Sequence, residues 1–140
     1  MPRPANPDAH DALLEAARHE FARHGLERAR VEDIARRAGV SKGAFYLHFR
    51  TKEDALAELL QRFMGALEEH TRRRQEAEAA SDAGSGAEAR ALERRFDTEL
   101  LDLFWRNRLV LAAVEGAGAP GYSRIVSEFR RRIRGFVSDR

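Results

Sequence analysis

The segment Val31–Lys52, VEDIARRAGVSKGAFYLHFRTK, constrains the fold of this chain more than any other part of its sequence. Residues 31–38 keep the spacing of a helix, and Gly39 then interrupts the pattern. Ser41 is suited to cap a second short helix that ends near Phe49 or Arg50. Glycine tolerates the positive φ that a tight turn between two helices requires. The segment therefore predicts a helix-turn-helix.

Further helices are predicted before and after this motif. Asp8 or Asp11 is suited to cap a first helix, and Gly25 is expected to end it. Thr51 opens a capping box for a long amphipathic helix, and Ser123 is suited to cap the last one. No segment has the alternation of a strand, so the expected fold class is all-α. The expected helices outside the motif cover residues 8–24, about 52–80, about 88–114, and 123 onward.

The chain also predicts where loops and buried segments lie. Proline, glycine and serine gather at residues 1–7, 81–86 and 115–121, and we expect loops there. Leu100–Val114 is apolar nearly all round, which favours a helix buried between other helices.

Composition excludes several classes of protein. The chain has 140 residues and no cysteine, so disulfides and thiolate metal sites are excluded. It has neither the apolar run of a membrane span nor that of a signal peptide, and the expectation is a soluble cytoplasmic protein without a membrane partner. The net charge is only +2, but residues 1–52 hold ten Lys and Arg against seven Asp and Glu. This local basic excess lies on the half of the chain with the motif, as expected of nucleic-acid binding.

Two kinds of side chain alternate within the motif. Apolar residues such as Ile34 and Phe45 have the spacing to fill the space between the helices. The outward residues of the second helix are small, basic or hydrogen-bonding. Lys42 can reach a guanine edge or a phosphate, and Gly43 and Ala44 let the backbone approach a groove floor. The side chains suited to hold phosphates are those of Tyr46, His48, Lys52 and Thr51.

This segment closely resembles the DNA-binding domain of TetR-family transcriptional regulators. The resemblance covers about residues 11–67. It is carried by Ile34-Ala35, Ala38-Gly39-Val40-Ser41-Lys42-Gly43, Phe45-Tyr46, His48-Phe49 and Lys52-Glu53, together with Phe21 and Gly25-Leu26 of the first helix.

The resemblance implies a homodimeric repressor that binds an operator in double-stranded DNA and is released by a small apolar or amphipathic effector. It implies a helix-turn-helix domain over residues 8–52 and a helical effector-binding and dimerisation domain over residues 53–140. The positions that it implies for DNA contact are Val31, Ser41, Lys42, Gly43, Ala44, Tyr46, Leu47, His48 and Lys52, and Arg30 is expected to add charge.

The chain departs from the family pattern in two places. Arg30-Val31 stands where many members have a Thr-Thr pair, so Val31 has no hydroxyl to donate to a phosphate. Members usually continue for two more long helices, so the second domain is expected to be C-terminally shortened, unless the chain dimerises differently or is monomeric.

Other candidate functions rest on weaker patterns. Phe63, Met64, Phe104 and Trp105 are expected either to line an effector pocket or to form ordinary core. The apolar stripe Ile125–Val137 leaves open an alternative function as a helical protein-interaction module or adaptor. No residue constellation indicates catalysis, a metal or a cofactor, and none of these is expected.

Overall fold

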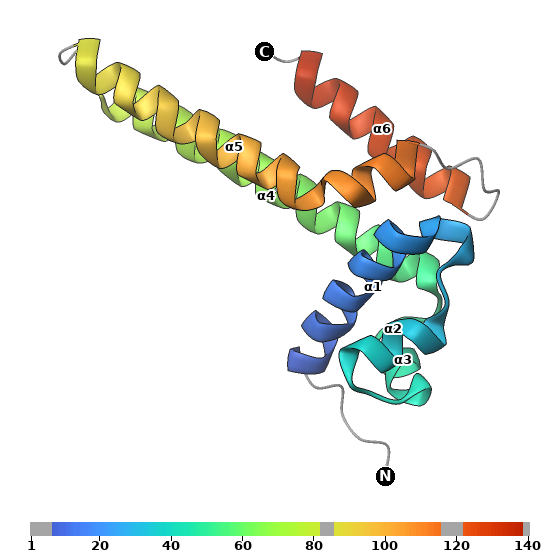
Figure 1. The fold of residues 1–140 in the computed structure, drawn as a ribbon. Coiled ribbons are helices and arrows are strands. Elements are labelled where there is room, and N and C mark those ends of the chain that lie inside the picture. Colours follow the sequence, from blue (N-terminus) through green and yellow to red (C-terminus); the bar gives the residue numbers. More distant parts are fainter. Residues whose placement is uncertain (1–6, 82–85, 116–121, 139–140) are drawn as a thin grey trace. The chain divides into compact units, whose positions relative to one another are not determined.

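The computed structural model describes residues 7–81, 86–115 and 122–138, and all six of its helices are α-helices (Figure 1). The expected all-α fold class is confirmed over these residues. The loops expected at residues 1–7, 81–86 and 115–121 fall almost wholly outside the described ranges. The helices are α1 (Pro7–Arg28), α2 (Val31–Ala38), α3 (Lys42–His48), α4 (Lys52–Ala80), α5 (Gly86–Glu115) and α6 (Ser123–Ser138).

Helix α1 carries the largest buried face of the N-terminal part. Leu13, Ala17 and Phe21 are fully buried at helical spacing, which explains why this segment folds as an amphipathic helix. Gly25 has φ 79° and ψ 169°, so the regular helix breaks there as predicted. The chain then resumes a helical turn as far as Arg28, which the sequence did not predict.

The predicted caps determine where the next helices begin. Ser41 Oγ accepts a hydrogen bond from the Ala44 amide at 3.1 Å, which caps α3. Thr51 Oγ1 accepts one from the Asp54 amide at 3.2 Å, which caps α4. The predicted spans of α2 and α4 agree with those observed.

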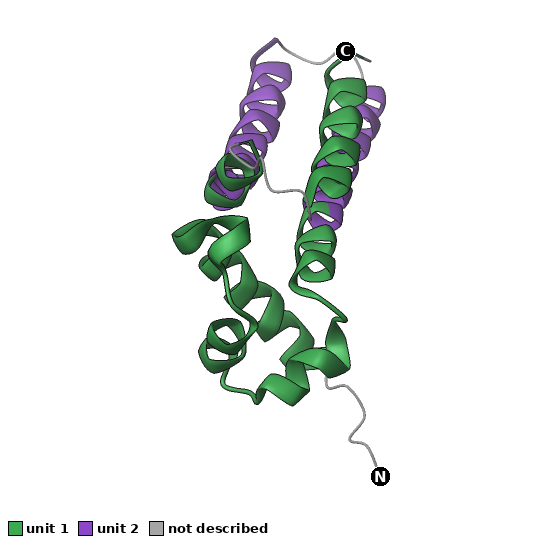
Figure 2. Ribbon diagram, turned by 90° about the vertical axis from the view of Figure 1, so that its right-hand side faces the viewer, with its two compact units in different colours: residues 1–60, 109–140 green, residues 61–108 purple. Residues whose placement is uncertain are grey.

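The chain divides into two compact units, Met1–Leu60 with Leu109–Arg140, and Gln61–Arg108 (Figure 2). We call them unit 1 and unit 2. Unit 1 therefore contains the helix-turn-helix together with the end of α5 and all of α6. The boundaries predicted for two domains, residues 8–52 and 53–140, remain a prediction.

A single apolar cluster forms the core of unit 1. Phe21, Ile34, Phe45 and Leu56 are fully buried in it and come from α1, α2, α3 and α4. Val110, Val114, Tyr122 and Val126 belong to the same cluster, so the C-terminal segment packs into the core of the helix-turn-helix.

Tyr122 joins distant parts of unit 1. It lies just before α6 and is buried, and its hydroxyl donates a hydrogen bond of 2.7 Å to the backbone carbonyl of Leu26. Burial raises the pKa of the Tyr122 phenol, and the nearby carboxylates of Glu53 and Glu27 raise it further. The phenol therefore stays neutral and remains a donor at neutral pH.

In unit 2, α4 and α5 run side by side in opposite directions (Figure 1). The buried His70 ring hydrogen-bonds the carbonyl of Phe96 at 2.8 Å. Ion pairs join the exposed edges of the two helices, among them Arg73 with Glu99 at 3.1 Å.

The expectation that Leu100–Val114 is buried all round is wrong. Leu101 is 71% exposed and Trp105 65% exposed, whereas Val110 and Val114 are buried. Within this chain only one face of the segment packs against other helices, because apolar character on every face does not determine which faces find a neighbour.

Two kinds of feature are absent from the described ranges. Over residues 7–81, 86–115 and 122–138, no helix is both long enough and apolar enough to span a bilayer. Over the same ranges, no group of three or more His, Cys, Asp or Glu side chains is arranged to hold a metal ion.

Candidate nucleic-acid interface

The corner between α2 and α3 is built by Gly39. Its φ of 74° and ψ of 26° lie in the left-handed region that favours glycine. The Gly39 amide donates to the Arg36 carbonyl at 3.1 Å, and the Val40 amide donates to the Ala35 carbonyl at 3.0 Å. These bonds satisfy carbonyl groups in the last turn of α2, and the chain turns there toward α3.

Burial of one face of α3 determines which residues point outward. Phe45 and Phe49 are buried in the unit 1 core, with ring centroids 5.4 Å apart. Tyr46 is 50% and Leu47 51% exposed, and Lys42 is exposed at the start of the helix. The structure thus places Lys42, Tyr46 and Leu47 on an open surface, as a recognition helix requires.

The fold does not explain why position 43 is a glycine. A Cβ added there would meet only Ser41 Oγ, at 3.8 Å, which is ordinary van der Waals contact. Its φ is not in the left-handed region either, since that conformation occurs only at Gly25 and Gly39 among the described residues. Alanine would therefore fit the folded chain at this position, and the fold itself does not require glycine there.

Lys42 has a partner that the sequence analysis missed. Its Nζ donates to Oε1 of Glu32, on α2, at 2.7 Å. This contact raises the pKa of Lys42 and lowers that of Glu32, each chiefly through the hydrogen bond between them. Glu32 therefore holds the ammonium group over the face between α2 and α3, and an incoming phosphate would compete with it.

The start of α2 lies at the edge of the same surface. Arg30 is the N-cap residue, with extended backbone, an exposed side chain and no side-chain cap hydrogen bond. Val31 is half-buried and packs against the unit 1 core. Arg30 is thus available for a phosphate, whereas Val31 contributes packing.

Lys52 binds the backbone of the turn that follows α1. Its Nζ donates to the carbonyl of Glu27 at 2.8 Å and to that of Ala29 at 2.9 Å. An ammonium group has three donors, so one remains for a phosphate. Together with Tyr122, Lys52 satisfies carbonyls over residues 26–29, and we call this arrangement the carbonyl clamp.

His48, at the end of α3, is half-buried rather than freely exposed. Its Nδ1 lies 3.0 Å from Nδ1 of His10, on α1. Burial lowers the pKa of His48 and His10 lowers it further, while Glu58 partly opposes both effects. His48 is therefore mainly neutral at neutral pH.

The helix-turn-helix formed by α2 and α3 lies within a segment that matches a known protein family. Residues 13–59 match the sequence model of the family described as bacterial regulatory proteins, tetR family. Over these residues the chain is thus similar to the TetR family.

Two curated relatives illustrate the similarity. The chain is 46% identical over 52 residues to the transcriptional repressor KstR2 of Mycobacterium tuberculosis, a match that covers 37% of this chain and 26% of that protein. It is 40% identical over 53 residues to the fatty acid metabolism regulator protein of Bacillus subtilis, with 38% of this chain and 27% of that protein covered. The matched segments thus span only about a quarter of these relatives.

A solved structure extends the similarity of fold to the whole chain. The fatty acid degradation regulator FadR from Bacillus halodurans aligns over 98% of this chain and 67% of its own, with a TM-score of 0.61. The sequence identity is 23%, so this likeness concerns the fold alone.

The residues expected to line an effector pocket do not all lie together. Phe63 and Phe104 meet edge to face, with ring centroids 5.3 Å apart, and Met64 is buried. Trp105 lies at the surface, and the Arg108 guanidinium covers its ring at 3.9 Å. The structure brings Phe63 and Phe104 together and leaves Trp105 on the outside.

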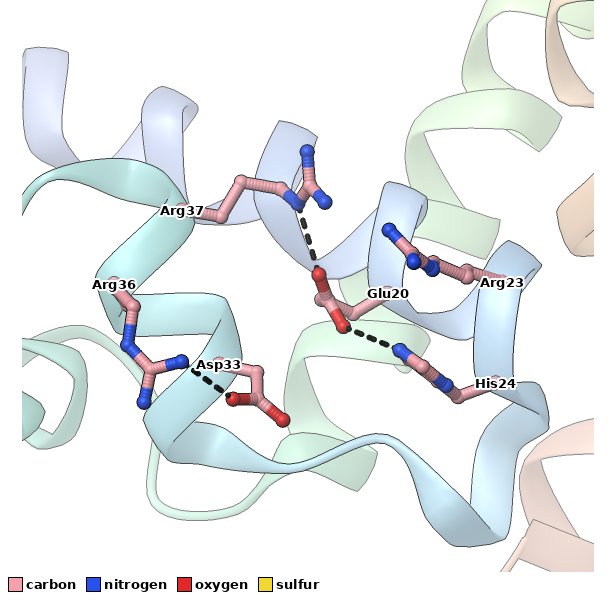
Figure 3. Close-up of a pocket in the computed structure, with 6 residues that line it drawn as sticks. All are labelled: Glu20, Arg23, His24, Asp33, Arg36 and Arg37. Carbon is pink, nitrogen blue, oxygen red and sulfur yellow. Dashed lines mark hydrogen bonds and ion pairs between the residues drawn. The ribbon is translucent and has the colours of Figure 1, made fainter.

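A polar groove of about 490 Å³ lies between α1 and α2 in unit 1 (Figure 3). At its base, the buried Glu20 accepts a hydrogen bond from Arg37 Nε at 2.8 Å, and its other oxygen lies 3.3 Å from His24 Nε2. The sequence analysis missed this buried carboxylate. Helical spacing could have found it, since Glu20 lies on the same face as Leu13 and Ala17.

Proposed function

We propose that this chain is a sequence-specific DNA-binding transcriptional regulator of the TetR family, and that it acts as a repressor. One observation carries the proposal: α3 has its inner face fixed by Phe45 and Phe49, while Lys42, Tyr46 and Leu47 stand exposed on its outer face. A helix held rigidly in this way can enter a major groove without losing its position.

The exposed groups fall into two sets, one suited to contact base edges and one suited to contact phosphates. Lys42 suits a guanine edge or a phosphate, and Gly43 and Ala44 allow close approach of the backbone. Tyr46 and Leu47 add polar and apolar contacts at the groove wall. Besides Tyr46 and Thr51, the groups suited to hold phosphates are Arg30, Ser41, His48 and Lys52, while Val31 packs against the core of unit 1.

A single chain carries one recognition helix, so we propose that a homodimer binds the operator. Two copies of α3 would need a separation of roughly 34–36 Å, which is one turn of DNA. Light scattering after size exclusion, with and without operator, measures the number of chains bound. Such a role would place the chain in the cytoplasm.

We further propose that a small apolar or amphipathic effector releases the operator. The name of one similar protein, the fatty acid metabolism regulator protein of Bacillus subtilis, supports this chemistry. Within unit 2, the aromatic pair Phe63 and Phe104, together with Met64 and Trp105, would contact such a molecule. The effector can act only if it binds the DNA-incompetent state better than the DNA-bound one.

The first experiment selects duplexes from a random library and measures the affinity of the enriched sequence. Lys42→Ala should weaken operator binding by about 1–3 kcal/mol if Lys42 contacts a base. Arg134→Ala is the matched control, because it removes one positive charge from an exposed position of α6, outside the motif. Failure to enrich any duplex, together with an absence of salt-dependent binding, would refute the proposed function.

A second candidate is a helical protein-interaction module. The exposed Leu101 and Trp105 on α5 favour it, because large apolar side chains at a surface often mark a contact. A monomer with no affinity for duplex DNA at low salt would support this candidate over the regulator.

A further inference from the structure

Two histidines and a glutamate from separate helices of unit 1 form a chain of contacts behind the recognition helix. His10 on α1 places Nδ1 at 3.0 Å from Nδ1 of His48 on α3. The other ring nitrogen of His10, Nε2, lies 2.6 Å from Oε2 of Glu58 on α4. The His10 ring also packs against Phe49, with ring centroids 4.8 Å apart. All three polar residues are partly buried.

These distances restrict where the protons can lie. An ionised carboxylate only accepts hydrogen bonds, so His10 carries a hydrogen on Nε2. The contact between the two Nδ1 atoms is a hydrogen bond only when one of them, and not both, carries a hydrogen. Three arrangements satisfy both conditions: one in which both rings are neutral, one that adds a proton to His10, and one that adds it to His48 instead.

In the first arrangement His10 is neutral and its Nδ1 accepts. His48 must then donate from Nδ1, which leaves Nε2 of a neutral His48 bare and able only to accept. In the second arrangement His10 is protonated and donates from Nδ1. His48 then accepts at Nδ1 and carries its hydrogen on Nε2, which becomes a donor.

A phosphate oxygen accepts hydrogen bonds and cannot donate them. The bare Nε2 of the first arrangement therefore opposes a DNA phosphate, whereas the Nε2–H of the second binds it. We propose that His10 is a positioning residue for DNA binding: oriented by Glu58, it sets the tautomer of His48 and makes operator affinity rise when the pair takes up a proton. This inference rests on the proposed DNA-binding function.

Of the two rings, it is His10 that contacts the Glu58 carboxylate, at 2.6 Å. The groups whose charges act on His48 are His10 from α1 and Glu58 from α4. Asp11, next to His10 in α1, is exposed. The pKa of His48 is lowered, chiefly by burial, so His48 stays neutral while the carboxylate of Glu58 faces His10.

The closing experiment measures operator affinity between pH 6 and pH 8 at fixed salt for the full chain. With one linked proton, the affinity of the wild type should fall by up to about tenfold per pH unit as the pair loses its proton. His10→Gln should flatten this profile, because a carboxamide does not titrate. His19→Gln is the matched control, since His19 is an exposed histidine on the same helix, and it should keep the wild-type profile.

A second measurement needs no DNA and separates this inference from the proposed function. Long-range 1H–15N NMR spectra of the free protein report which ring nitrogen of each histidine is protonated. His48 should carry its hydrogen on Nδ1 at high pH and on Nε2 at low pH in the wild type, and this exchange should be lost in His10→Gln. A His48 tautomer that does not change with pH, or an unaltered affinity profile in His10→Gln, would overturn the inference. A wild type without duplex affinity whose His48 still changes tautomer would refute the proposed function and leave the proton relay intact.

Discussion

Replacing Tyr122 by phenylalanine tests whether the segment before α6 is part of the DNA-binding fold. The substitution keeps the buried ring and removes only the hydroxyl that donates to the Leu26 carbonyl at 2.7 Å. Leaving a buried carbonyl without this donor costs about 1–3 kcal/mol. We expect the free energy of unfolding to fall by that amount, although the substitution lies 96 residues from Leu26 in the sequence.

Urea denaturation followed by circular dichroism at fixed protein concentration measures this loss. Tyr46→Phe is the matched control, because the chain has only two tyrosines and Tyr46 is half exposed on α3. The control should change the free energy of unfolding by no more than about 0.5 kcal/mol.

The dependence of stability on pH gives an independent readout of the same contact. The pKa of Tyr122 is raised in the folded chain, so the unfolded chain loses this proton first as pH rises. The contribution of Tyr122 is therefore complete below a pH of about 10, the ordinary pKa of tyrosine, and declines above it. Tyr122→Phe should lack this alkaline decline. A variant as stable as the wild type, with the same alkaline profile, would refute the assigned role of the hydroxyl.

Two further substitutions address the motif itself. Lys52→Met should lower the free energy of unfolding by about 1–3 kcal/mol in urea denaturation, because two carbonyls lose a charged donor. In buffer without urea, at a pH where the variant is folded, Lys52→Met should also reduce the slope of operator affinity against salt by about one unit. An unaltered slope would argue against a phosphate contact. Gly43→Ala should stabilise the chain by about 0.5–1 kcal/mol in the same denaturation assay while weakening operator binding in a gel shift. Gly39→Ala should instead destabilise it, since its φ is 74°; equal effects at the two glycines would contradict the separation of fold from interface.

Local rules predicted the backbone of the motif well. Gly39, Ser41 and Thr51 act through neighbours only a few residues away, and the structure has the turn and the caps where their chemistry requires them. The outward residues of α3 followed from the same logic, since burial of Phe45 leaves the opposite face of the helix exposed.

Contacts between distant residues were not predictable in this way. His10 meets His48 across 38 positions, and Lys52 reaches the Glu27 carbonyl across 25. Helical spacing does place His10 on the inward face of α1, but the identity of its partner depends on how the helices pack. The exposure of Trp105 likewise depends on which faces of α5 meet another helix, which no local pattern encodes.

The carbonyl clamp has a consequence for anyone who transfers this helix-turn-helix into another chain. A graft that ended within the first turns of α4 would include Lys52. It would lack Tyr122 and Val126, and with them the part of the unit 1 core that comes from the C-terminal segment. The transplanted motif would keep its exposed side chains on α3 and lose a donor beneath the turn that precedes α2. A chimera should therefore be cut by three-dimensional contact, with residues 109–138 treated as part of the module, even though they lie at the other end of the sequence.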